Sequence, residues 1–115
     1  MTTSNTPAAG LVGYWNFDEG SGSIAHDTSG SGYSGAVSGA SWTTGKINSG
    51  LSVNGTTNYV VTPNIALGTT FSISAWVNSR GTAQGGYVRI AETQYSPGFY
   101  LGTNASGAGL DVTSV

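Results

Sequence analysis

The residues best suited to chemistry in this sequence are two adjacent carboxylates at the end of an apolar stretch. Asp18 and Glu19 follow the run Tyr-Trp-Asn-Phe and precede Gly-Ser-Gly. Carboxylates beside glycines offer a hard cation such as calcium both oxygen ligands and a backbone that can bend around the ion. The alternative is that the two acids are solvated charge at the end of a strand, which is the usual environment of acidic side chains.

A second segment rich in oxygen atoms follows at 26–35, with the sequence His-Asp-Thr-Ser-Gly-Ser-Gly-Tyr-Ser-Gly. It is too polar to form a core, so we expect a loop, and loops on a rigid scaffold commonly carry sites. Asp27 is either a cation ligand or an Asx-turn acceptor that organises its own loop. His26 is the single histidine. We expect it to be an exposed loop residue, because calcium prefers oxygen ligands.

Catalysis is not expected. Glycoside hydrolysis requires two carboxyl groups that flank the bond at a defined separation. Only Asp18 and Glu19 are adjacent in sequence, and neighbouring residues of a strand point to opposite faces. A Ser-His-acid arrangement is not readable from a single histidine. We therefore predict that the chain is not an enzyme.

Aromatic side chains suggest a different activity, the binding of sugars. Trp76 lies in the run Phe-Ser-Ile-Ser-Ala-Trp-Val-Asn, where it alternates with serine and asparagine on the face opposite the apolar residues. A ring beside hydroxyl and amide groups is a platform for a carbohydrate, and Tyr59 and Tyr87 could add further rings. The alternative is that Trp76 packs against other parts of the protein, as most tryptophans in strands do.

Composition excludes several classes of partner. Only 7% of the 115 residues are charged, and the basic side chains are Lys46, Arg80 and Arg89. Three scattered cations cannot neutralise the phosphates of a nucleic acid or hold an anionic membrane surface. No apolar run approaches the roughly 20 residues that span a bilayer, so we predict no membrane insertion. The absence of cysteine excludes disulfides and thiolate metal sites.

The elements that must position these residues are predicted to be strands. Three Trp, six Tyr and three Phe argue against disorder. No apolar helical period is sustained, whereas short alternating runs recur between turn signals, a pattern typical of an all-β sandwich or barrel. Asn54-Gly55 is a strong turn pair. The predicted strands are 11–17, 35–37, 50–53, 58–62, 71–78, 87–92, 99–102 and 110–112. Residues 1–9 lack the basic and apolar regions of a signal peptide and are predicted to be a flexible leader.

Four motifs in order resemble the LamG-like jelly-roll domains of the concanavalin A-like lectin/glucanase superfamily. They are Leu-Val-Gly-Tyr-Trp-Asn-Phe-Asp-Glu-Gly-Ser-Gly from Leu11, Asp-Thr-Ser-Gly-Ser-Gly-Tyr-Ser-Gly from Asp27, Gly-Leu-Ser-Val-Asn-Gly from Gly50 with Asn-Tyr-Val-Val, and Phe-Ser-Ile-Ser-Ala-Trp-Val from Phe71. The resemblance covers about residues 10–105. It implies an antiparallel β-sandwich at 10–115 and a carbohydrate-binding or adhesive module of extracellular, cell-surface or virion-associated proteins.

The resemblance covers only the first part of the family's domain, because the family's later strands have no counterpart here. The expected sandwich is therefore incomplete, and open sheet edges invite pairing with another chain. Three explanations are open: a fragment of a longer protein, one half of a split domain completed by a complementary chain, or a homo-oligomer. A structural or assembly module that binds no sugar is the alternative function.

The resemblance also implies a structural calcium ion. Residue by residue, Glu19 matches the family's first acidic ligand, and Asp27 matches the second, with oxygens around Ser29 and Ser31. The family's third acidic ligand lies in the part that this sequence does not match. We therefore expect an incomplete calcium shell in this chain alone.

Overall fold

The chain is all-β in the part that the structure describes. The computed structural model describes residues 10–78, 88–93, 99–103 and 110–114, and it divides the chain into two compact units, Met1–Ser72 and Ile73–Val115. These described residues contain no helix, and every pairing between their strands is antiparallel. No helix among them is long and apolar enough to cross a membrane. The predicted fold class is confirmed at this level.

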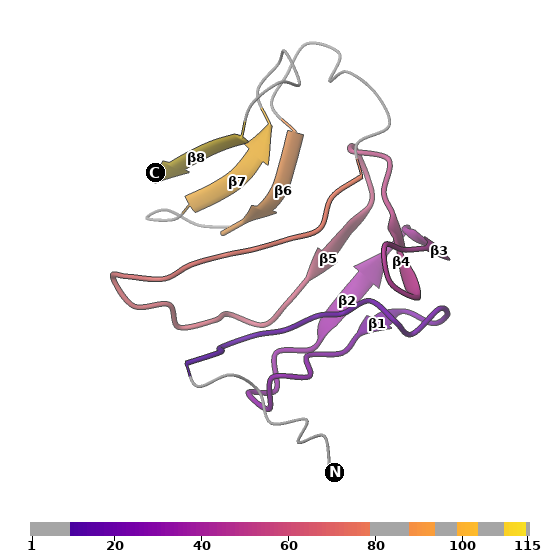
Figure 1. The fold of residues 1–115 in the computed structure, drawn as a ribbon, viewed down its shortest axis with the longest axis horizontal. Helices are drawn as coiled ribbons and strands as arrows, with labels where there is room; N and C mark the ends of the chain where they lie inside the picture. The colour runs from indigo at the N-terminus through magenta and orange to yellow at the C-terminus, as the bar shows by residue number, and fades with distance from the viewer. Residues whose placement is uncertain (1–9, 79–87, 94–98, 104–109, 115) are drawn as a thin grey trace. The chain divides into compact units, whose positions relative to one another are not determined.

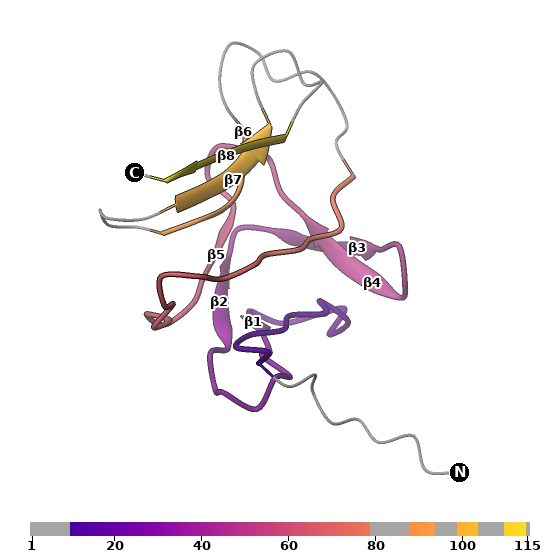
Figure 2. The same cartoon turned by 60° about the vertical axis from the view of Figure 1, so that its left-hand side comes forward.

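The first unit contains a three-stranded sheet and a hairpin (Figure 1). The sheet has the order β1 (Ile24–Ala25), β2 (Gly35–Ser38), β5 (Tyr59–Val61). The hairpin pairs β3 (Ser41–Thr44) with β4 (Ser49–Ser52). Figure 2 shows the sheet and the hairpin from a second direction. Consecutive strands β2 and β3 thus belong to different sheets, and so do β4 and β5, which means that two short connections cross between the sheets.

The second unit is a three-stranded antiparallel sheet of β6 (Val88–Glu92), β7 (Phe99–Thr103) and β8 (Leu110–Ser114), with β7 in the centre. The register of β6 shifts between Arg89 and Ala91, as in a β-bulge. Residues three apart in a regular strand point to opposite faces. The extra residue of the bulge brings Arg89 and Glu92 to one side, where they form an ion pair of 2.5 Å.

The predicted strand at 11–17 is wrong as a strand but right in its alternation. The segment makes a single bridge, between Trp15 and Asp27, and no continuous ladder. Gly13, Trp15 and Phe17 are nevertheless half-buried, and the residues between them are exposed. Phe17 has a left-handed backbone (φ 55°), so the extended run ends there. The pattern correctly predicted which side chains share the half-buried face. A strand also needs a neighbouring backbone to pair with along its whole length.

The predicted strand at 71–78 is also wrong. It has no regular strand structure, and all eight residues are exposed. It runs across the boundary between the two units, at Ser72 and Ile73. An extended segment is not stable as a strand unless its N–H and C=O groups pair with a partner strand. The described residues form no partner strand for 71–78.

The other predicted strands are confirmed, with shifts of one or two residues at their ends. Those at 35–37, 50–53 and 58–62 are β2, β4 and β5, and those at 87–92, 99–102 and 110–112 are β6, β7 and β8. The sequence analysis missed β1 and β3, which are only two and four residues long. Both become strands through tertiary pairing rather than through a sustained pattern. The predicted leader at 1–9 lies outside the described residues.

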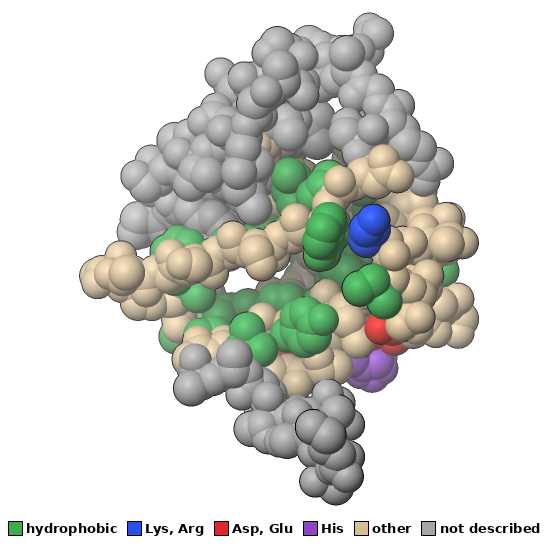
Figure 3. All heavy atoms as spheres, viewed as in Figure 1, with side chains coloured by type: hydrophobic (Ala, Val, Ile, Leu, Met, Phe, Trp, Pro, Cys, Tyr) green, Lys and Arg blue, Asp and Glu red, His purple; other side chains and the backbone are tan. Residues whose placement is uncertain are grey.

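The apolar core of the described part is small. Ala25 is the buried hydrophobic residue there, and no large side chain in this part is fully buried. Large apolar side chains instead reach the surface, where Figure 3 shows them interspersed among polar groups. The more exposed ones are Leu11, Val12, Tyr14, Ile24, Ile47, Val53, Tyr59, Val61, Phe71, Ile73, Trp76 and Val77.

Candidate functional site

The Asp27 carboxylate is the centre of a polar cluster in the first unit. Its Oδ1 accepts the backbone N–H groups of Tyr14 and Ser29, both at 2.9 Å. Its Oδ2 accepts the N–H of Tyr33 at 2.9 Å. The bond from Ser29 is an Asx-turn, so Asp27 does organise its own loop, as one of the two readings of the sequence predicted.

The environment of Asp27 favours the charged form. Burial raises the pKa of this carboxyl, but the nearby Ser29 side chain and the hydrogen bonds from the backbone of Tyr14, Ser29 and Tyr33 lower it by more. The resulting pKa is about 2, against an ordinary value of 3.8. Hydrogen bonds that are donated to a carboxylate favour its ionised form. Asp27 therefore carries a full negative charge at neutral pH.

Ser29 and Ser31 lie in the same loop as Asp27. The Ser29 hydroxyl donates to the carbonyl of Val12 at 3.1 Å, and its oxygen accepts the N–H of Ser31 at 3.2 Å. Ser29 is half-buried and Ser31 is exposed. The structure thus brings three of the predicted cation ligands, Asp27, Ser29 and Ser31, into one loop, where the first two also tie that loop to the segment at 12–14.

Glu19 has one satisfied and one unsatisfied carboxylate oxygen. Its Oε1 accepts the backbone N–H of His26 at 2.6 Å, which closes the turn at 19–26. Its Oε2 is buried and has no hydrogen-bond partner. A buried carboxylate oxygen without a partner is costly, and it is the kind of atom that a bound cation would satisfy. Glu19 thus binds His26, the residue before Asp27. Among the described residues, it shares no hydrogen-bond donor with the Asp27 carboxylate.

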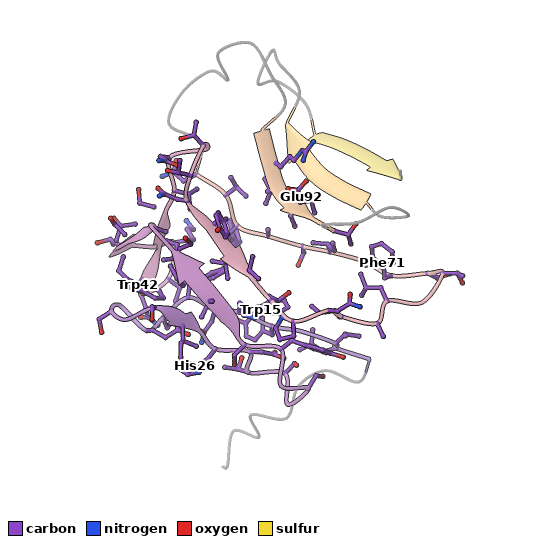
Figure 4. The ribbon with its side chains drawn as sticks, turned by 180° about the vertical axis from the view of Figure 1, so that it is seen from behind. Trp15, His26, Trp42, Phe71 and Glu92 are labelled. Carbon is purple, nitrogen blue, oxygen red and sulfur yellow. The ribbon has the colours of Figure 1, made fainter. Side chains whose placement is uncertain are left out.

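Long-range hydrogen bonds from side chains hold this region in place. Trp15 donates its ring N–H to the carbonyl of Tyr33 at 2.9 Å, and Trp42 donates its ring N–H to the carbonyl of Gly22 at 2.9 Å. Ser49 donates its hydroxyl to the carbonyl of Phe17 at 2.5 Å. Figure 4 labels Trp15, His26 and Trp42 in this unit. The loops that carry Glu19 and Asp27 are thus anchored from β3, from β4 and from the segment at 13–17.

The described residues contain no group of three or more histidine, cysteine or acidic side chains that could hold a metal. A cation at Glu19 would therefore depend on one or two carboxylates together with carbonyl and hydroxyl oxygens. Calcium accepts such oxygens and takes six to eight ligands. The neighbouring Asp18 is exposed and accepts a hydrogen bond from Asn48 at 3.3 Å.

The predicted sugar-binding rings fall in different parts of the chain. Trp76 is 83% exposed and belongs to the second unit. Tyr59 is 54% exposed and lies on β5 of the first unit, opposite Ser38. Tyr87 lies outside the described residues. Exposure of Trp76 is the property that a stacking platform requires.

One ordered polar loop was not singled out as a site by the sequence analysis, the turn that begins at Asn54. Its side-chain oxygen accepts the backbone N–H groups of Thr56, Thr57 and Asn58. The sequence signal was the Asn-Gly pair, which we interpreted as a turn. The abundance of Asn, Ser and Thr across the chain masked the special role of this asparagine.

The comparisons with known proteins identify no relative. The chain matches no family model, no curated protein and no solved structure.

Proposed function

We propose that this chain is a non-catalytic carbohydrate-binding or adhesive module of the LamG-like jelly-roll type, acting outside the cell or on a cell or virion surface. The observation that carries the proposal is the exposure of Trp76, at 83% of its surface. An indole ring that is largely exposed leaves apolar surface in contact with water. A ligand with apolar C–H faces, such as a pyranose, removes that surface from water when it stacks on the ring.

The surroundings of Trp76 agree with a sugar ligand. Ser74 and Asn78, two residues on either side, are exposed and carry hydroxyl and amide groups. Ligand sites combine an apolar surface with a few polar groups that fix the orientation of the ligand. The low charge of the whole chain, 7%, favours a neutral glycan over a charged partner.

The test is a glycan array with the purified chain and two matched variants. Trp76→Ala removes the ring, and we expect it to weaken binding about tenfold or more, as for the loss of a stacked aromatic contact. Tyr14→Ala removes another exposed ring, one that is 52% exposed in the first unit, and should leave binding unchanged. If no glycan binds, or if both variants lose binding equally, Trp76 is not the platform.

A second candidate function is that of an assembly module, which binds no sugar and works as part of a larger complex. The observation that favours it is the set of twelve exposed large apolar residues together with a core in which Ala25 is the buried hydrophobic side chain of the described part. Apolar side chains that gather into one contiguous patch mark protein interfaces, and open sheet edges pair with other chains. Light scattering on the same sample distinguishes the two: a stable oligomer without glycan binding supports assembly.

A structural calcium ion is part of the first proposal. Its support is Glu19 Oε2, which is buried without a hydrogen-bond partner and is attached to a turn with two glycines, Gly20 and Gly22, in left-handed conformations. Glu19 would be the charged ligand, and the oxygens of the loop that contains Asp27, Ser29 and Ser31 are the next candidates. The ion would stabilise the turn, because it would neutralise a carboxylate oxygen that the protein leaves unsatisfied.

A further inference from the structure

The loop that connects β4 to β5 contains Asn54-Gly55, the single Asn-Gly dipeptide of the sequence. The Asn54 side-chain oxygen accepts the N–H groups of Thr56, Thr57 and Asn58 at 3.0, 2.9 and 3.0 Å. Its Nδ2 donates to the Thr57 hydroxyl at 2.8 Å. The Asn54 N–H donates to the side-chain oxygen of Asn58 at 3.0 Å. The amide of Asn54 is therefore held by four hydrogen bonds, and its backbone by a fifth.

An asparagine followed by glycine can react with its own backbone. The backbone nitrogen of Gly55 attacks Cγ of Asn54 and gives up its proton, the Cγ–Nδ2 bond breaks, and ammonia leaves. Water then opens the resulting succinimide at either carbonyl, which yields aspartate or isoaspartate. Glycine has no Cβ that would obstruct this attack, and both residues are exposed to water.

We propose that Asn54 is prone to spontaneous deamidation and that the folded loop slows this reaction. Ring closure requires Cγ to turn toward the Gly55 nitrogen. That movement takes Oδ1 away from the three N–H groups that it accepts and takes Nδ2 away from Thr57. The backbone is also restrained, because the Asn54 N–H donates to the side-chain oxygen of Asn58. Each hydrogen bond that must open slows the reaction about fivefold.

The two products differ in what they do to the loop. Aspartate at 54 keeps an oxygen that accepts the same three N–H groups. Isoaspartate adds a methylene to the backbone and shortens the side chain, so the five hydrogen bonds cannot all re-form. This loop joins β4 to β5, which belong to different sheets. Isoaspartate at 54 would therefore loosen a connection between the sheets, whether or not the chain binds a glycan.

The test measures deamidation at position 54 by peptide mapping with mass spectrometry. The 115-residue chain is incubated at one mildly alkaline pH, once folded and once in denaturant. We expect the folded chain to deamidate more slowly. Asn58→Ala and Thr57→Val should each speed the reaction in the folded chain about fivefold and leave the denatured rate unchanged. Asn48→Ala, which removes an amide outside the loop, should change neither rate. A folded chain that reacts as fast as the denatured one overturns the proposal.

Hydrogen exchange keeps the test decisive if a variant does not fold. In the unmodified chain the amides of Thr56, Thr57 and Asn58 donate to Asn54, so they should exchange slowly compared with an unstructured peptide. Rapid exchange at all three would show that the loop is open in solution, and the proposed protection would be wrong.

Discussion

The Asp27 carboxylate accepts the backbone N–H of Tyr14 at 2.9 Å, which joins two segments that are thirteen residues apart in the sequence. The next residue completes the connection, because Thr28 donates both its N–H and its hydroxyl to the Tyr14 carbonyl, at 2.8 and 3.2 Å. Both backbone groups of Tyr14 are thus satisfied by the loop that Asp27 begins. The order of this loop and the position of the segment at 12–15 are therefore coupled through Asp27 and the two residues that follow it.

Asp27→Ala should destabilise the first unit by about 1–3 kcal/mol, because it removes the acceptor of three backbone N–H groups. Asp27→Asn should cost less, since its remaining side-chain oxygen can still accept from Tyr14 and Ser29. Urea unfolding measures both. Asp18→Asn is the matched control and should be nearly neutral, because Asp18 is exposed. Equal effects of Asp18→Asn and Asp27→Ala would contradict the role given to Asp27.

Stability should fall in acid through Asp27. Its pKa in the folded protein, about 2, lies below the ordinary value of 3.8, so the unfolded chain binds this proton more readily. The stabilisation is therefore complete above about pH 5, and it declines as the pH falls through 3.8 toward 2. Urea titrations between pH 5 and pH 2 would measure the slope. We expect a shallower slope for Asp27→Asn over that interval, and an unchanged slope would contradict the assignment.

The sequence predicted the strands whose partners formed, and failed where pairing depends on the rest of the chain. The alternation at 11–17 correctly assigned Trp15 and Phe17 to the inner face, but only Trp15 found a bridge partner. The stronger alternation at 71–78 formed no strand at all. Alternation indicates which side chains share a face. It does not indicate which neighbouring strand will form the backbone hydrogen bonds.

The candidate site, like the strands, was only partly predictable from the sequence. The Asx-turn of Asp27 follows from Asp-Thr-Ser-Gly, a local pattern. The bonds from Asp27 to Tyr14 and from Glu19 to His26 depend on how the chain folds back, so spacing alone could not reveal them. The five hydrogen bonds of the loop at Asn54 were likewise hidden, because one Asn-Gly pair specifies a turn but not the donors and acceptors around it.

Gly45→Ala should destabilise the β3–β4 hairpin. An added Cβ at this position would collide with the backbone carbonyl of Ser49, which cannot rotate away as a side chain can. Forced overpacking of this kind costs about 1–3 kcal/mol. Gly50→Ala is the matched control, because its Cβ would meet the nearest atom at an ordinary contact distance of 3.4 Å. Urea unfolding of the two variants should separate them, and similar midpoints would show that the hairpin turn adjusts.

Glu92→Gln should change stability by less than about 1 kcal/mol, even though Arg89 and Glu92 form an ion pair of 2.5 Å. The two side chains are 60% and 43% exposed, and exposed pairs contribute little because water and salt screen them. The free energy of unfolding at low and high salt measures the effect. A loss larger than this would mean that the bulge in β6 depends on the pair.

Calcium should raise the melting temperature of the protein, and EDTA should lower it if the ion is retained during purification. A ligand that binds only the folded state at one hundred times its Kd adds about 2.7 kcal/mol. Glu19→Gln should abolish this response, because it removes the charge while its side-chain oxygen can still accept from His26. Asp18→Asn, at the exposed neighbouring acid, should keep the response. If neither calcium nor EDTA changes the melting temperature of the wild-type protein, a structural ion is excluded. The buried, unpaired Glu19 Oε2 would then destabilise the folded state.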